Sequence, residues 1–105
     1  MKRTKDEGRR VEKAAKEILA EILAKNEKGE DVVIKDKIIK GDLDLSKLDL
    51  TEKNGKKLLG SSIQIKHCKI QRLAILKNID FLKEINFEDT NFNGGANFYG
   101  SNFYG

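Results

Sequence analysis

The sequence is poor in the residues that usually build disulfide frameworks and catalytic centres. Its 105 residues include one cysteine, one histidine, no proline and no tryptophan. One cysteine excludes an internal disulfide framework and fits a reducing compartment. No apolar run approaches the roughly 18 residues of a membrane span, and the charged N-terminus lacks the apolar core of a signal peptide. These absences predict a cytoplasmic protein that does not enter a membrane, and the length of 105 residues predicts one domain.

Charge, in contrast, is abundant and mixed in sign. Charged residues make up 36% of the chain, and the net charge is +4. Because acidic and basic residues are interspersed, most of this charge is typical of solvated surface and disfavours nucleic acid as a partner. A basic N-terminal group keeps direct binding of nucleic acid open as an alternative, and such binding would weaken steeply with salt. Its members are Lys2, Arg3, Lys5, Arg9 and Arg10.

Residues 1–30 contain the pattern of one amphipathic helix. Apolar residues fall at helical spacing on one broad face, charged residues cover the other face, and Gly29 is a natural C-terminal stop. We predict a helix over residues 9–27 that covers one end of the remaining domain. Its predicted contact residues are Val11, Ala15, Ile18, Leu19 and Ile22.

Residues 31–105 follow a different rhythm, in which large apolar residues recur at alternating steps of five and six. The resulting 11-residue unit is a repeat, and repeats of this kind bury their apolar side against their neighbours. The twelve repeated positions, which we call rungs, are Ile34, Ile39, Leu45, Leu50, Ile65, Ile70, Leu76, Phe81, Phe87, Phe92, Phe98 and Phe103. The rhythm breaks once, and residues 51–62, which contain Asn54-Gly55, are predicted to form an inserted loop.

The residues that precede each rung are also patterned. The residue two positions before a rung is apolar or small in eleven of twelve cases, and the residue directly before it is Asp or Asn in seven. The first group is predicted to share the interior face with the rung, because strand side chains alternate with a period of two. The second group is predicted to face outward, where short polar side chains bond local backbone at repeated corners.

Units of a small residue, Asp or Asn, Leu or Phe and two polar residues resemble the pentapeptide-repeat family. The matching segments are 43–47, 48–52, 90–94, 96–100 and 101–105. The resemblance covers roughly residues 32–105 and is similar to a looser, Phe-rich branch, because a sixth residue alternates into the strict pattern. It implies a right-handed, four-sided parallel β-helix. We therefore expect a mainly β fold: a short right-handed quadrilateral parallel β-helix of about three coils, capped by one N-terminal α-helix.

Few residues offer chemistry. His67 and Cys68 are adjacent, and neighbours in a strand point to opposite faces, so they are not expected to form a nucleophile–base pair. Cys68 is predicted to pack inside, and His67 to lie on the surface. Asp42, Asp44 and Asp49 are better explained as turn-capping residues than as a paired-carboxylate site. Further metal ligands are not seen at suitable spacing. We therefore predict no enzyme, no catalytic residues, no cofactor and no metal.

Binding is the remaining class of function. We expect a protein-interaction or structural module that self-associates, as a homodimer, through an uncapped C-terminal coil containing Phe98, Tyr99, Phe103 and Tyr104. The alternative for this end is a longer natural protein in which further repeats follow. Some members of the resembling family mimic DNA and act on type II topoisomerases. The charge disfavours that role here, because residues 63–105 carry five cations against four anions. Any other protein partner is unknown.

Overall fold

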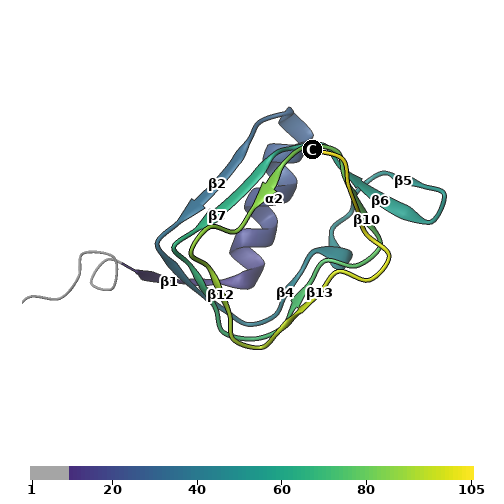
Figure 1. Ribbon diagram of the computed structural model, residues 1–105. Helices are drawn as coiled ribbons and strands as arrows, with labels where there is room; N and C mark the ends of the chain where they lie inside the picture. The colour runs from purple at the N-terminus through teal and green to yellow at the C-terminus, as the bar shows by residue number, and fades with distance from the viewer. Residues whose placement is uncertain (1–9) are drawn as a thin grey trace, which may run out of the picture.

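The computed structural model describes residues 10–105 and is built mainly of short strands with one α-helix (Figure 1). The mainly β prediction with a single helix is therefore confirmed. The predicted basic residues Lys2, Arg3, Lys5 and Arg9 lie outside the described residues. The elements are β1 (Val11–Ala14), α2 (Ala15–Lys28), β2 (Val32–Lys35), β3 (Lys37–Lys40), β4 (Leu43–Asp44), the 3-10 helix η1 (Leu45–Lys47), β5 (Glu52–Lys53), β6 (Lys56–Leu59), β7 (Ile63–Lys66), β8 (Lys69–Ile70), β9 (Ala74–Ile75), β10 (Ile79–Phe81), β11 (Ile85–Asn86), β12 (Asn91–Phe92), β13 (Ala96–Asn97) and β14 (Asn102–Phe103).

The strands form four separate sheets. Their orders are β1-β3-β8-β12, β11-β7-β2, β13-β9-β4 and β14-β10-β6-β5. From β2 onward, the chain enters the four sheets in one fixed order and does so three times, so that successive passages lie over one another (Figure 1). We call these passages the first circuit (residues 32–59), the second circuit (63–81) and the third circuit (85–103).

The register between circuits matches the repeat in the sequence. Paired residues of the second and third circuits lie 22 positions apart, as for Ile63 beside Ile85 and Asp80 beside Asn102. One circuit therefore contains two of the 11-residue units. Before the insertion, the partners between the first and second circuits lie 31 positions apart, as for Leu43 beside Ala74 and for the hydrogen bond from Leu73 N–H to Asp42. After the insertion, the offset is again 22, as for Leu59 beside Phe81 in the β6–β10 pairing. The first circuit is longer because it contains the insertion.

The insertion differs from the predicted loop over residues 51–62. It forms a hairpin in which β5 and β6 pair antiparallel, and it projects from the outline of the circuits (Figure 1). Asn54 and Gly55 have φ angles of 55° and 79°, in the left-handed region that a tight hairpin turn requires. β6 then joins β10 in parallel. The hairpin lets the chain leave the first circuit and return to it in register.

The hairpin also changes which residue is the fourth rung. Leu59 lies beside Phe81 in the β6–β10 pairing, so Leu59 and not the predicted Leu50 stands in register with the later rungs of that sheet. Leu50 is buried as well, in the chain that leads into the hairpin. Two apolar residues separated by an insertion compete for one position, and strand pairing selects the residue that continues the parallel ladder.

The start of the chain corrects a second expectation. The helix begins at Ala15 rather than at residue 9, and β1 precedes it. Val11, predicted to contact the domain from the helix, lies in β1 beside Lys37 and is 59% exposed. Its backbone N–H donates to the Asp36 carbonyl at 2.9 Å. Residues 11–14 form a strand rather than a further turn of the helix, because β1 pairs with backbone groups that β3 would otherwise leave exposed at a sheet edge.

α2 lies against the first circuit, with contacts to β1, β2, β3 and β4. Ala15, Ile18 and Ile22 are buried, and Leu19 is partly buried against the same core. The helix ends at Gly29, whose φ of 71° is left-handed. The apolar interior of the first two circuits is nearly sealed, with no member more than 7% exposed. Its residues are Val32, Ile34, Ile39, Leu43, Leu45, Leu48, Leu50, Leu59, Ile63, Ile65, Cys68, Ile70, Ala74, Leu76, Ile79 and Phe81.

Candidate functional site

The third circuit forms an edge of every sheet. β11, β12, β13 and β14 each stand at the end of their sheet's strand order. An edge strand presents unpaired N–H and C=O groups, which form a template for pairing with another chain. Within residues 10–105, four such strands around one circuit make a rim of backbone groups that face no further strand.

Inside this rim lies a group of phenylalanines. The ring centroids of Phe87 and Phe92 are 5.0 Å apart, and those of Phe98 and Phe103 are 5.8 Å apart. Phe103 also stacks on Phe81 of the second circuit, at 5.0 Å and an interplanar angle of 3°. Phe87, Phe92 and Phe98 are half-buried, and Phe103 is 51% exposed. We call Phe87, Phe92, Phe98 and Phe103 the aromatic end.

The predicted self-association residues are all in or next to this surface. Phe98 and Phe103 are neighbours within the aromatic end. Tyr99 and Tyr104 are both largely exposed, while their backbones bond the second circuit: the Tyr104 N–H donates to the Phe81 carbonyl at 2.9 Å, and the Tyr99 carbonyl accepts from Asn78 at 2.8 Å. Each tyrosine therefore has a fixed backbone and a side chain available for contact.

The third circuit is also nearly uncharged. Residues 85–105 contain no Lys or Arg, and their acidic residues are Glu88 and Asp89. Amides are frequent instead, and some bond locally: the Asn102 amide donates to Asp80 at 2.9 Å, and Asn97 accepts from the Tyr99 N–H at 2.9 Å. A surface of this composition repels neither a second copy nor a weakly charged partner.

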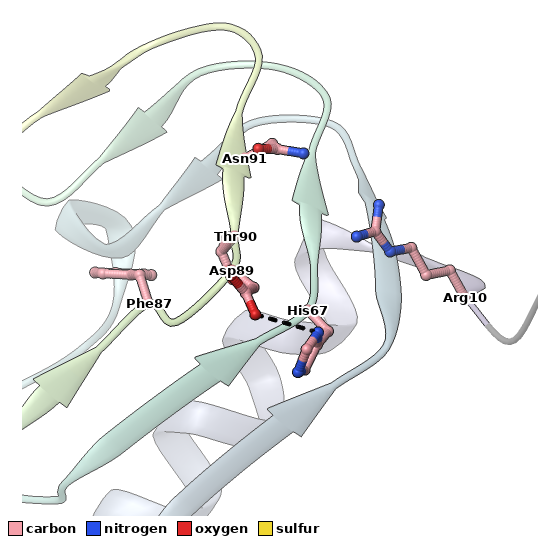
Figure 2. A pocket seen from close by; sticks show the side chains of 6 residues that line it. All are labelled: Arg10, His67, Phe87, Asp89, Thr90 and Asn91. Atoms are coloured by element: carbon pink, nitrogen blue, oxygen red, sulfur yellow. Dashed lines mark ion pairs between the residues drawn. The ribbon is translucent and has the colours of Figure 1, made fainter. Parts of the chain in front are cut away.

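A separate group of polar side chains lies at the corner that follows β7 and β11 (Figure 2). His67 Nδ1 lies 3.8 Å from Asp89 Oδ2, and Glu88 Oε1 lies 3.7 Å from Lys66 Nζ. A shallow pocket of about 400 Å³ adjoins the group. It is lined by Arg10, His67, Phe87, Asp89, Thr90 and Asn91.

The structure places His67 and Cys68 on opposite sides of the wall of the second circuit. His67 has a φ of 53° and lies at the outer corner. Cys68 is completely buried, and its thiol lies 3.2 Å from the Lys66 carbonyl that it can donate to. Burial raises the pKa of the Cys68 thiol above its ordinary value, so the nucleophilic thiolate is disfavoured.

Two of the acidic residues predicted to cap turns do bond backbone. Asp44 accepts from the Ser46 N–H at 3.0 Å, and Asp42 accepts from the Leu73 N–H of the next circuit at 3.1 Å. Asp44 therefore bonds within its own turn, whereas the bond of Asp42 joins the first circuit to the second.

Sequence reasoning missed Glu88 and Asp89 as neighbours of His67. Asp89 follows His67 by 22 positions, which is the length of one circuit. The signal was therefore present in the repeat, because residues one circuit apart are stacked beside each other.

These features define a class: a small, mainly β protein with one α-helix and several parallel sheets. Within residues 10–105, α2 covers the first circuit, and no other element covers the third. Comparison of the chain with protein-family models, with curated proteins and with solved structures found no match. No helix within residues 10–105 has the length and apolar character that crossing a bilayer requires.

Proposed function

We propose that this chain is a right-handed, quadrilateral β-helix of the pentapeptide-repeat type that acts as a non-enzymatic interaction module. α2 and β1 cap one end of the β-helix. The third circuit at the other end binds the third circuit of a second copy, so the module is a homodimer. The observation that carries the proposal is the aromatic end, enclosed by four edge strands.

Apolar burial supplies the driving force. Half-exposed phenylalanines gain free energy when a partner removes them from water, at about 25 cal/mol for each Å² of apolar surface. Aromatic residues are enriched among the residues that dominate interface energies, and here Tyr99 and Tyr104 flank the phenylalanines. At the other end, α2 already buries the apolar side chains of the first circuit.

The composition of the third circuit favours a second copy as the occupant. A two-fold contact places each surface against itself, so a strongly charged surface would meet its own charge. The third circuit has no cation, and its two acids lie together at one corner. Exposed asparagines such as Asn91 and Asn97 carry both donors and acceptors, so they can pair with their own copies.

The direct test is the molar mass in solution, measured by size-exclusion chromatography with light scattering at about 50 µM protein, since association depends on concentration. We expect twice the chain mass. Phe103→Lys is expected to give a monomer, because it places a charge in the centre of the contact. Tyr104→Lys, which leaves the Phe81–Phe103 stack intact, is expected to shift the equilibrium in the same direction.

Val33→Lys is the matched control, because Val33 is 50% exposed on β2 of the first circuit, close to the 51% of Phe103. It is expected to remain dimeric. A monomeric wild-type protein at this concentration would rule out self-association, and equal effects of Val33→Lys and Tyr104→Lys would place the contact elsewhere.

A further inference from the structure

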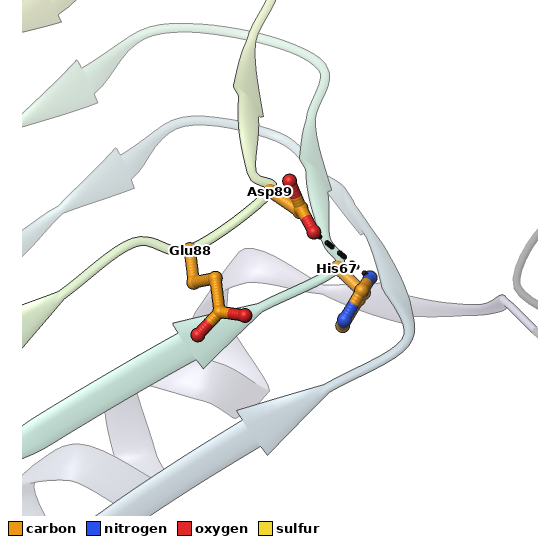
Figure 3. Close-up of side chains that lie close together, drawn as sticks. All are labelled: His67, Glu88 and Asp89. Atoms are coloured by element: carbon orange, nitrogen blue, oxygen red, sulfur yellow. Dashed lines mark ion pairs between the residues drawn. The ribbon is translucent and has the colours of Figure 1, made fainter.

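The corner cluster of His67, Glu88 and Asp89 lies outside the aromatic end and has a donor set of its own (Figure 3). One imidazole nitrogen and one oxygen from each carboxylate all lie within 4.8 Å of one another. His67 comes from the second circuit, and Glu88 and Asp89 come from the third circuit. The cluster therefore spans two circuits that are also joined by backbone pairing.

The backbone sets the positions of these three residues. The His67 N–H donates to the Glu88 carbonyl at 3.0 Å, which holds the two circuits together at this corner. His67 and Asp89 have φ angles of 53° and 50°, a left-handed conformation in which His and Asp are enriched. This conformation interrupts the strand alternation, so consecutive residues Glu88 and Asp89 both reach toward His67 (Figure 3).

Thr90 secures the following position. Its hydroxyl donates to the Ile65 carbonyl at 2.8 Å, and its backbone N–H donates to the Phe87 carbonyl at 3.2 Å. Glu88 and Thr90, which flank Asp89 in the chain, are thus each hydrogen-bonded to the second circuit. Ligands fixed in this way lose less entropy when they gather around an ion.

We propose that His67, Glu88 and Asp89 bind a borderline divalent cation of the Zn²⁺ type, which joins the third circuit to the second. Imidazole nitrogen with carboxylate oxygens is a donor set suited to zinc, and three protein ligands leave a fourth position for water. Zinc requires bond lengths of about 2.0–2.2 Å, so the three donor atoms must draw together. Both carboxylates are exposed and are attached by rotatable bonds, which permits this movement.

Two basic side chains oppose a cation at this corner. Lys66 is the partner of Glu88 at 3.7 Å, and Arg10 lines the adjoining pocket. The Lys66–Glu88 pair is at the surface, where an ion pair contributes at most about 1 kcal/mol, so a coordinated metal displaces it. The adjoining pocket is open to solvent and is lined by His67 and Asp89, so water can reach the fourth position of the metal. Because an imidazole that binds a metal does so without a charge, the two carboxylates balance the charge of one divalent ion.

Isothermal titration of ZnCl₂ into the full chain, prepared without a polyhistidine tag, tests the site. We expect one ion per chain. Asp89→Asn keeps the side-chain shape and tolerates the same φ, and it is expected to weaken binding about tenfold or more because a charged ligand is lost. His67→Asn is expected to abolish binding. Asp80→Asn changes a partly buried acid on the same circuit as His67. It is the matched control and should bind as the wild type does.

Two further measurements test whether zinc binds at this corner and with this selectivity. MgCl₂ is expected to give no heat under the same conditions, because Mg²⁺ prefers an all-oxygen, octahedral shell. Cys68→Ala should bind Zn²⁺ unchanged, because the Cys68 thiol is buried on the other side of the wall. The proposal is wrong if the wild type does not bind Zn²⁺, if folded His67→Asn or Asp89→Asn binds it as tightly, or if Cys68→Ala loses it. Far-UV circular dichroism establishes that each variant is folded.

Discussion

The first and third circuits both contribute side chains to the same interior, but these side chains are buried to different degrees. Ile39 of the first circuit and Phe92 of the third both pair with Ile70, so they belong to one column of apolar side chains. Ile39 is fully buried, because β1 pairs with its strand and α2 covers its circuit. Phe92 is only half-buried, although it is the larger residue. A repeat thus determines the column of side chains, whereas separate elements determine whether an end of the column is covered.

The largest expected effect comes from truncating this column at its covered end. Ile39→Ala should cost about 3 kcal/mol of unfolding free energy, because it removes buried atoms and leaves a cavity. Phe92→Ala should cost less than about 2 kcal/mol, below the usual cost for a buried phenylalanine, because Phe92 remains in contact with water. Urea unfolding followed by circular dichroism measures both, at a low protein concentration so that association adds little stability. An equal or larger cost for Phe92→Ala would mean that the third circuit is covered in solution.

A smaller effect is expected from the polar link between the covering helix and the chain that leads into the second circuit. The Asn26 side-chain oxygen accepts from the Gly60 N–H at 2.9 Å and from the Ser61 N–H at 3.2 Å. Asn26→Ala leaves two backbone donors without this partner, and each bond contributes about 0.5–1.5 kcal/mol. We therefore expect a loss of about 1–3 kcal/mol in the same urea experiment.

Glu27→Ala is the control for this link, because Glu27 is an exposed neighbour on the same helix. It should change the stability by less than about 0.5 kcal/mol. Equal stability losses for Asn26→Ala and Glu27→Ala would show that the loss reflects helix propensity and that α2 is not fastened through Asn26.

Much of this architecture is visible in the sequence because it depends on periodicity. Residues such as Ile70 and Phe92 recur two 11-residue units apart, and this offset is the register of the β8–β12 pairing. The helix is equally legible, because Ile18 and Ile22 lie one helical turn apart on a charged background and Gly29 ends the segment. Local preferences and the global fold agree at these positions.

The features that could not be predicted from the sequence depend on how segments far apart in the chain pair with one another. Val11 fits a helical pattern as well as a strand, and the open edge of β3 decides in favour of the strand. Leu50 and Leu59 are both apolar, and the parallel pairing of Leu59 with Phe81 decides which of them is the rung. The repeat places Asp89 beside His67, but the direction of their side chains depends on a left-handed backbone at both residues, which the spacing alone does not reveal.

The smallest expected effect is a difference in thiol reactivity between the second circuit and the third. Cys68 and Ala96 both lie two positions before a rung, but Cys68 is completely buried and Ala96, on edge strand β13, is exposed. Burial also raises the pKa of Cys68, so its thiolate is scarce even at pH 8. The wild-type thiol should react with a chromogenic disulfide reagent at least about a hundredfold more slowly than the new thiol of Ala96→Cys in a Cys68→Ala background, because Cys68 must await local opening.

Protein concentration adds a second readout to this labelling experiment. If the third circuits of two copies pair, the rate for Ala96→Cys should fall as the protein is concentrated, whereas the rate for Cys68 should stay constant, because Cys68 is covered within its own chain. Comparable rates at the two positions in dilute protein would mean that the third circuit is as closed as the second. The proposed difference between the two ends would then be wrong. A fast reaction at Ala96→Cys that does not depend on concentration would retain the open end but remove the second copy as its occupant.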